Sequence, residues 1–454
     1  MSGYDSFLRD KARTIHKVGI DVSMGELHER LFDFQRDIVS RMLSLGRGAI
    51  FASTGLGKTG MQIEWAAQVH NRGHGDILIF APLAVAQQTA REAKLFGVNV
   101  TVCREPEDVR PGVNITNYDR LAKFDLARFG GVVLDESSIL KATDGKTRTA
   151  LIEASQFVRF RLACTATPAP NDVMELGNHA EFLGVMRATE MLATYFVHDG
   201  GDTQKWRLKG HAERSFWQWV GSWSSVVDSP ADMGYDGSAY ELPPLVMHEH
   251  ILDAPAVVEG ETLFALPAAS LTERRAARSV SVDMRVNRAA EILASKPGPW
   301  LVWCGLNREA DALRAIVPTI VEVRGADLPD VKTERLVAFS EGRIDSLLSK
   351  ASIAGFGLNW QHCSQMIFLG IDDSWESLYQ AIRRCWRFGQ TQPVDVHLIL
   401  SSAEIRVLEN LKRKERDAAR MRKAMAAEAQ SVTVSHRIRS TYSPVSVEVP
   451  SWIA

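Results

Sequence analysis

The chain has 454 residues, which at roughly 100 to 200 residues per domain predicts about two to four domains and excludes a single small binding module. Its 53 Lys and Arg residues nearly balance 55 Asp and Glu residues, and the formal net charge of -2 excludes a global positive field, so any nucleic acid must bind in a local groove. The 45% hydrophobic and 24% charged fractions are those of globular proteins and exclude disordered and fibrous classes.

The sequence shows no sign of export or of a membrane partner. No apolar run reaches about 18 residues, the length of a transmembrane helix, and the N-terminal region is charged throughout. The five cysteines are odd in number and contain no CxxC pair, which argues against a disulfide framework and a zinc site. We expect a cytoplasmic protein, in the host cell cytoplasm if a phage encodes it.

Short apolar segments alternate with helix-like stretches in two series along the chain. This alternation is typical of a mostly parallel β-sheet with helices on both faces. The fold class expected is therefore α/β, with two parallel-sheet domains. The expected strands are residues 49–52, 77–81, 113–116, 132–134 and 161–164 in the first series, and 300–304, 320–323, 346–349, 365–369 and 394–400 in the second.

The segment between the two series has a different composition. It lacks the alternation, concentrates four tryptophans and then contains the Pro243-Pro244 break, which predicts a helical insertion followed by an extended linker. The predicted division is residues 1–183 for an N-terminal helix and the first domain, 184–279 for the insertion and linker, 280–403 for the second domain, and 404–454 for a basic helix and tail.

A glycine-rich segment after the first expected strand carries the strongest local signal. It reads A-x-x-x-x-G-K-T from Ala52 to Thr59 and precedes a helix-like run. Gly55 and Gly57 would let backbone N–H groups turn inward around a phosphate, and the helix dipole would add to this attraction. Lys58 would reach the β- and γ-phosphates of ATP, and the Thr59 hydroxyl would bind Mg²⁺. A glycine-rich turn without a ligand is the alternative, which the order of strand, loop and helix disfavours.

Two carboxylates follow the expected strand 132–134. Asp135 would hold Mg²⁺, largely through water, and Glu136 would orient and deprotonate an attacking water molecule. Taken alone, an Asp-Glu pair at this place is more often a solvated strand end. The phosphate loop upstream favours the catalytic interpretation.

In this order the motifs resemble those of superfamily-2 DNA helicases and translocases, specifically the Swi/Snf-like branch, and most closely its compact members encoded by phages and prophages. The resemblance extends from about Phe32 to Leu400. It implies two tandem RecA-like domains with a helical insertion between them. Gln35, 23 residues before Lys58, is similar to the family's adenine-reading glutamine.

Further segments of the first domain are similar to motifs that the family uses for DNA contact and coupling. Residues 79–83 resemble motif Ia, 115–118 resemble motif Ib, and 165–168 resemble motif III. The residues carried over are Pro82, Thr116, Asn117, Thr165 and Thr167. Ser137 and Ser138 replace the usual small residue and histidine after the Asp-Glu pair, so the family's link from that histidine must be absent or rebuilt.

Residues 355–359 of the second domain resemble motif V, whose glycines permit close backbone approach to phosphate or DNA. Lys350, just upstream, is expected either to contact a phosphate or to lie in solvent at a strand end. The resemblance assigns Asn359 to the nucleic-acid and coupling residues. It also completes the expected nucleotide-binding set, which is Gln35, Thr54, Gly55, Leu56, Gly57, Lys58, Thr59, Asp135, Gly355 and Gly357.

Residues 380–390 resemble motif VI and its Gly-Gln ending. A spacing of three predicts that Arg384 and Arg387 lie on one helical face. Guanidinium groups suit the charge that spreads over the γ-phosphoryl oxygens, so Arg387 is expected to be the arginine finger and Arg384 to assist it. A basic solvated helix face is the alternative, but it does not explain why these arginines follow a motif V-like loop. Arg383 and Trp386 depart from the family pattern, which usually has glycine and histidine there.

The function implied is an ATP-dependent DNA helicase or translocase. Duplex, forked or single-stranded DNA is the expected partner, with phage or host replication and repair proteins as further candidates. An RNA helicase is one alternative, and the Phe-Gly-Gln ending of residues 388–390 favours DNA over it. An ATP-switched binding or loading protein is another, and it requires that Glu136 be dispensable. Strand separation, duplex tracking and oligomeric state stay open.

Two further regions leave alternatives open. Aromatic and basic residues mix around Trp206, Trp217, Trp219 and Trp223, which would suit base stacking worth about 1 to 3 kcal/mol per base. Packing of a small helical subdomain is favoured for most of these rings, with Trp206 left open. The basic helix after residue 404 would either contact DNA or present a solvated face.

Overall fold

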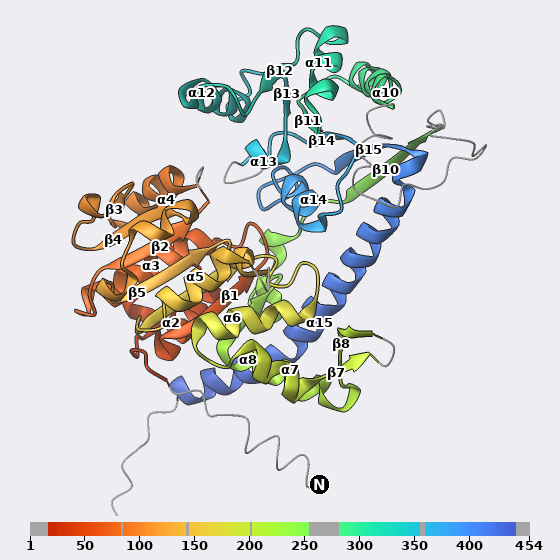
Figure 1. Cartoon of the computed structure of the whole chain (residues 1–454). Coiled ribbons are helices and arrows are strands. Elements are labelled where there is room, and N and C mark those ends of the chain that lie inside the picture. Colours follow the sequence, from red (N-terminus) through yellow and green to blue (C-terminus); the bar gives the residue numbers. More distant parts are fainter. Residues whose placement is uncertain are drawn as a thin grey trace, which may run out of the picture.

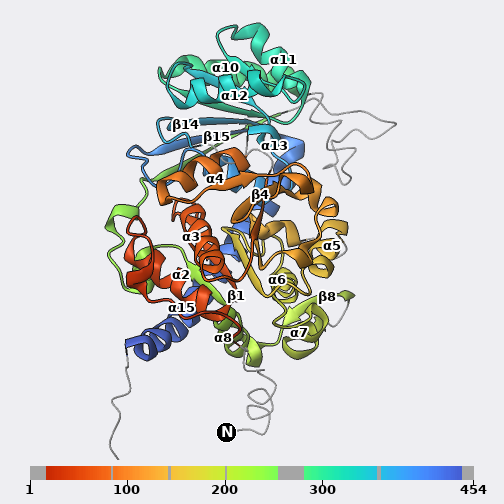
Figure 2. The same cartoon turned by 90° about the vertical axis from the view of Figure 1, so that its left-hand side faces the viewer.

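The computed structural model describes residues 17–82, 85–141, 145–199, 202–253, 281–354 and 359–441. Two α/β domains lie one above the other, joined along one side by a long C-terminal helix (Figures 1 and 2). Among the described residues, no helix combines the length and the apolar character that crossing a bilayer requires.

The first domain is built on a seven-stranded sheet in the order β3-β4-β2-β5-β6-β1-β9, with every neighbouring pair parallel. The central strands are buried over nearly their whole length, as expected for a sheet covered on both faces, with only Arg47 partly exposed. The strands are β1 (Arg47–Ala52), β2 (Ile77–Ala81), β3 (Val100–Val102), β4 (Val113–Asn117), β5 (Gly131–Asp135), β6 (Phe160–Thr165) and β9 (Ser224–Val227).

Helices cover both faces of this sheet, and the buried apolar residues form two hydrophobic clusters. One cluster includes apolar residues of α2 and α3, and the other includes apolar residues of α6, α7 and α8. The helices are α2 (Asp33–Leu45), α3 (Lys58–Asn71), α4 (Ala86–Ala93), α5 (Lys146–Ala154), α6 (Leu176–Leu183), α7 (Ala188–Tyr195) and α8 (Glu213–Trp223).

The second domain has a six-stranded parallel sheet in the order β10-β15-β14-β11-β13-β12. The two sheets confirm the predicted fold class, and each expected strand is present. The strands are β10 (Leu245–Leu252), β11 (Trp300–Cys304), β12 (Val321–Val323), β13 (Ser346–Ser349), β14 (Gln365–Leu369) and β15 (Val394–Ser401). The helices are α10 (Val282–Ser295), α11 (Asn307–Ile316), α12 (Pro329–Ser340), α13 (Ala351–Ala354) and α14 (Trp375–Ile382).

The region predicted as a helical insertion contains more than helices. Besides α7 and α8 it holds an antiparallel hairpin, β7 (Phe196–Asp199) with β8 (Asp202–Leu208). It also supplies β9 to the first sheet and β10 to the second, which the sequence analysis did not predict. The predicted boundaries of the insertion stay a prediction. Trp217, Trp219 and Trp223 are buried, which confirms the packing interpretation, whereas Trp206 lies in the hairpin with its ring centroid 3.7 Å from that of His198.

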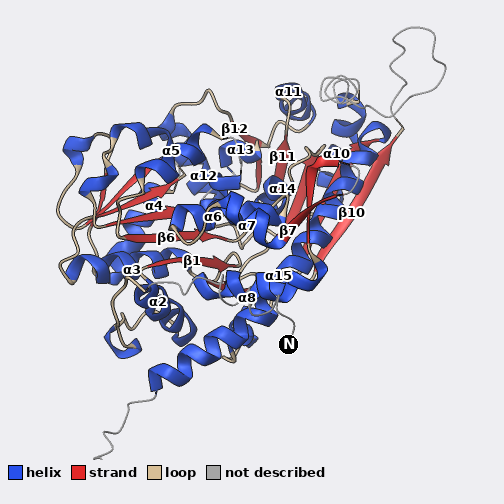
Figure 3. Ribbon diagram, turned by 60° about the horizontal axis from the view of Figure 1, so that its bottom comes forward, coloured by secondary structure: helices blue, strands red, loops and turns tan. Residues whose placement is uncertain are grey.

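The basic C-terminal segment forms α15 (Ile405–Thr441), which starts beside the second sheet and runs along the first domain next to α8 (Figures 1 and 3). Leu408 and Leu411 join the core of the second domain, whereas Met421 and Met425 join the core cluster around α8. The apolar face of α15, which the sequence did not lead us to expect, therefore packs on both domains. Whether its charged face contacts DNA or is only solvated stays a prediction.

Candidate nucleotide and nucleic-acid site

The loop between β1 and α3 has the backbone that a phosphate loop requires. Gly55 and Gly57 adopt φ angles of 95° and 76°, in the region that favours glycine. A Cβ on Gly57 would lie 2.3 Å from Nε2 of Gln35, so no larger residue fits there without a shift. Gly57 is the N-cap of α3 and has no side chain to cap the helix, which leaves N–H groups of the first turn for an anion.

Lys58, the first residue of α3, turns its amine back into this loop. Nζ donates hydrogen bonds to the carbonyl oxygens of Ala52 at 2.7 Å and Ser53 at 3.3 Å. Burial lowers the pKa of Lys58, and the nearby carboxylate of Glu136 partly opposes this shift. The amine therefore lies at the position from which it would turn to a phosphate.

Gln35 has both ends of its amide engaged. Oε1 accepts a hydrogen bond from the backbone N–H of Phe32 at 2.9 Å, and Nε2 donates to the carbonyl of Leu56 at 2.9 Å. The side chain thus caps α2 and holds the phosphate loop. Its predicted contact with adenine stays a prediction.

Asp135 ends β5, and Gln62 of α3 holds it in place. Nε2 of Gln62 donates to Oδ1 of Asp135 at 2.8 Å, and both side chains are buried. Burial raises the pKa of Asp135, while Gln62 and Lys58 oppose that shift. A bound divalent cation would also oppose it, because a cation favours the ionised carboxylate.

The backbone of Glu136 adopts an unusual, left-handed conformation. With φ of 56°, it is the single non-glycine residue in the described ranges with a positive φ angle. Such a conformation costs on the order of 1 to 3 kcal/mol and persists where surrounding contacts hold it. Burial raises the pKa of Glu136 to about 7, with Lys58 opposing the shift, so the carboxyl is poised to exchange a proton near neutral pH.

Arg384 and Arg387 do not lie on a helical face, so that prediction was wrong. Helix α14 ends at Ile382, and the segment then turns through short-range backbone hydrogen bonds towards Gly389, whose φ is 90°. Burial lowers the pKa of each arginine to about 10, and both stay charged at neutral pH. Nη1 of Arg387 donates a hydrogen bond to Oδ1 of Asn359.

A cavity of about 270 Å³ between the domains collects most of the predicted nucleotide site. Lys58, Thr59 and Glu136 line it from the first domain, and Arg384 and Arg387 line it from the second. The domains also touch at the phosphate loop, since a Cβ on Gly55 would lie 3.0 Å from Cβ of Phe388. The remaining predicted residues that line this cavity are Thr54, Gly55, Gly57, Asp135 and Asn359.

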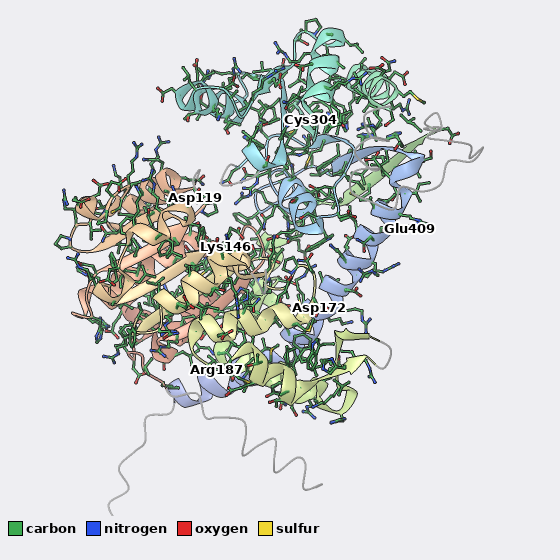
Figure 4. All side chains as sticks on the ribbon, viewed as in Figure 1. Asp119, Lys146, Asp172, Arg187, Cys304 and Glu409 are labelled. Carbon is green, nitrogen blue, oxygen red and sulfur yellow. The ribbon has the colours of Figure 1, made fainter. Side chains whose placement is uncertain are left out.

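A second cavity of about 730 Å³ lies on the other side of Glu136. Pro82, Asn117 and Lys350 line it, and their contact with nucleic acid stays a prediction. Its further lining residues include Asp119 and Lys146 of the first domain and Cys304 of the second, which lie on opposite sides of the space between the domains (Figure 4). Oδ1 of Asn117 is buried at this wall without a hydrogen-bond partner in the described part of the chain.

One residue that was predicted to contact nucleic acid does not reach this cavity. Thr116 is 1% exposed, and its hydroxyl donates to the carbonyl of Cys103 within the first domain, so it does not reach the cavity. Thr165 and Thr167, which the motif III resemblance assigned to coupling, are buried, and Thr165 forms hydrogen bonds with Glu136 and with the backbone of Thr167. Their coupling role stays a prediction. Gly355 and Gly357 lie outside the described residues, as does most of the motif V-like loop.

Sequence reasoning missed several residues that the structure brings to the site. Oγ of Ser137 lies 3.1 Å from Nε2 of the buried His179 on α6, which supplies a histidine contact although the motif itself has none. Glu376 of the second domain contacts Lys141 and Thr167 of the first. No pattern in the sequence pointed to these pairs, because their members lie 42 or more positions apart.

Comparison with known proteins assigns a class to the second domain. Residues 285–389 match the family model of the helicase conserved C-terminal domain. No curated protein matches the chain. Among solved structures, the SWI2/SNF2 ATPase core of Sulfolobus solfataricus in complex with dsDNA is similar, with 17% sequence identity over 93% of this chain and 98% of that chain, at a TM-score of 0.42. The protein thus has two α/β domains, and residues 285–389 of the second are similar to the helicase conserved C-terminal domain.

Proposed function

We propose that the protein is a nucleic-acid-stimulated ATPase that acts as a DNA helicase or translocase of the Swi/Snf-like branch of superfamily 2. The observation that carries this proposal is the 270 Å³ cavity, in which Lys58 and Glu136 of one domain face Arg384 and Arg387 of the other. The helicase match of residues 285–389 supports it independently.

The phosphate loop would bind the β- and γ-phosphates through its backbone N–H groups and the Lys58 amine. Thr59 and Asp135 would hold Mg²⁺, largely through water, and the ion would neutralise charge on the phosphates. Glu136 would orient and deprotonate the attacking water. Arg387 would stabilise the charge that develops on the γ-phosphoryl oxygens, with Arg384 beside it, which requires Arg387 to leave Asn359.

Movement along DNA would follow from the two-sided nature of the nucleotide site. Because residues of both domains would contact the γ-phosphate, ATP would close the cleft and hydrolysis would open it. DNA would lie in the 730 Å³ cavity, whose basic residues include Lys141, Lys146 and Lys350. Since the overall charge is -2, affinity would depend on a modest number of phosphate contacts and on salt.

The decisive experiment measures ATP hydrolysis while single-stranded DNA, duplex DNA, a fork or RNA is titrated. Stimulation by DNA beyond that by RNA supports the proposal. Preferential stimulation by RNA would favour the RNA helicase, and an absence of stimulation by any of the four would leave the ATP-switched binding protein. An origin in a phage or prophage, and replication or repair proteins as partners, stay predictions from the motif resemblance.

A further inference from the structure

A continuous series of hydrogen bonds leads from Glu136 to the second domain. Oγ1 of Thr165 donates to Oε2 of Glu136 at 3.2 Å and accepts from the backbone N–H of Thr167 at 3.1 Å. Oγ1 of Thr167 in turn donates to Oε1 of Glu376 at 3.2 Å. Because Glu376 lies in the first turn of α14, the series crosses from one domain to the other.

The second oxygen of Glu376 also accepts from the first domain. Nζ of Lys141 lies 2.5 Å from Oε2 of Glu376, so both carboxylate oxygens are bound across the cleft. Lys141 ends the short helix Ser137–Lys141, which directly follows the Asp135-Glu136 pair. One carboxylate therefore contacts both chain segments that adjoin Glu136, one after β5 and one after β6.

The ion pair is placed where a nucleic acid would compete for it. The Glu376 side chain is 12% exposed, whereas the Lys141 side chain is 41% exposed. Lys141 lines the 730 Å³ cavity together with Lys146 and Lys350. Because the Lys141 amine is accessible to solvent, a phosphate group that enters the cavity can compete with the Glu376 carboxylate for it.

From these contacts we infer that Glu376 is a positioning residue that holds the second domain on Lys141 and Thr167 while the cavity is empty, and that a nucleic-acid phosphate releases it by binding Lys141. This inference rests on the proposed function. The release frees α14 and the arginines that follow it to move towards the nucleotide. The hydrogen bonds of Thr165 and Thr167 link the release of Glu376 to the position of Glu136. Nucleic-acid occupancy thereby sets the rate of ATP hydrolysis.

The test compares Glu376→Gln, Lys141→Gln and the double variant with the unaltered protein. ATP turnover is measured without and with duplex DNA, and DNA affinity is measured separately. An interaction of about 1 kcal/mol corresponds to about a fivefold effect. Glu376→Gln raises the turnover without DNA about fivefold, lowers the stimulation ratio and binds DNA about fivefold more tightly. Lys141→Gln raises the same basal turnover but binds DNA about fivefold more weakly.

Opposite effects on DNA affinity with the same effect on basal turnover distinguish competition from a merely structural bridge, which would alter only the melting temperature. The double variant has the basal turnover of either single variant. Glu409→Gln removes an exposed carboxylate on α15 and serves as the matched control. Wild-type basal turnover and stimulation in Glu376→Gln or in the half-exposed Lys141→Gln would overturn the inference. If the unaltered protein shows no DNA stimulation, the proposed function itself fails.

Discussion

Thr165 donates a hydrogen bond of 3.2 Å from its Oγ1 to Oε2 of Glu136, so the end of β6 holds the carboxylate that follows β5. Residues 135 and 164 pair directly across these strands, which places the two strand ends beside each other. The hydroxyl also accepts the backbone N–H of Thr167, so its orientation is fixed from both sides. Thr165 therefore sets the direction in which Glu136 presents its second oxygen.

Thr165→Val removes this hydrogen bond at nearly constant volume. A hydrogen bond to a charged group contributes about 1.5 to 3 kcal/mol, which corresponds to a loss of about 10- to 100-fold in kcat if the bond acts in the transition state. We expect little change in KM for ATP, because Thr165 does not line the nucleotide cavity. Thr194→Val on α7 is the control, and a kcat equal to that of the control would refute the role of Thr165.

The left-handed backbone of Glu136 predicts that glycine at this position gives a more stable protein than a residue with a side chain, although activity requires the glutamate. A side chain in this conformation costs about 1 to 2 kcal/mol, which glycine avoids at a smaller cost in the entropy of the unfolded chain. The free energy of unfolding of Glu136→Gly should therefore be about 1 kcal/mol higher than that of Glu136→Ala, although neither variant should turn over ATP. Denaturant unfolding checks this difference, and equal stabilities would show that the conformation carries no strain.

Met425 lies in the C-terminal helix but belongs to the core of the first domain. It is 1% exposed and joins the cluster that contains Trp219 and Trp223. Met425→Ala should lower the free energy of unfolding by about 2 to 5 kcal/mol, the range for buried Met to Ala substitutions. The exposed Arg416→Ala on the same helix should change it little. A Met425→Ala protein as stable as that control would argue against the packing of α15 on the first domain.

The buried His179 predicts a loss of stability in acid. Burial lowers its pKa to about 4, below the value of about 6.5 in an unfolded chain. Since the unfolded chain binds the proton more tightly, the contribution of neutral His179 is complete above about pH 6.5 and declines as the pH falls towards 4.

The measurement is the free energy of unfolding of the protein and of His179→Gln at several pH values. Between pH 7.5 and pH 4, the free energy of unfolding of the unaltered protein should fall by about 3 kcal/mol relative to that of His179→Gln. Glutamine is chosen because its side chain can still form a hydrogen bond with Ser137. If the difference in the free energy of unfolding between the two proteins does not depend on pH, His179 titrates normally.

The strands of both sheets were predictable because each central strand is a short, continuous apolar run between helix-like stretches. The exceptions are β3, β9 and β10, and each has a physical reason. β3 has only three residues, and all three are half-buried. β9 is buried in the structure, but it begins with the polar residues Ser224 and Ser225, so its sequence lacks the apolar run that indicates a buried strand. β10 lies at a sheet edge and is only partly buried, so it lacks a clear apolar signal. Its membership in the second sheet depends on pairing with β15, about 150 positions away.

The local geometry of the candidate nucleotide site was predictable only where the site consists of consecutive residues. The phosphate loop and the Asp-Glu pair are each set by a few consecutive residues. The geometry of Arg384 and Arg387 was not, because the end of α14 depends on backbone hydrogen bonds in the following turn. The pairing of Lys141 with Glu376 spans 235 positions and exists only when both domains are folded and in contact.

We propose that residues of both domains hydrolyse ATP in one cavity in response to nucleic acid. Steady-state phosphate release is measured for the unaltered protein and for Glu136→Gln, each with saturating duplex DNA, alongside ATP binding. We predict DNA-stimulated release by the unaltered protein, and release by Glu136→Gln reduced at least about 100-fold with ATP binding retained. Normal phosphate release by Glu136→Gln would contradict the account.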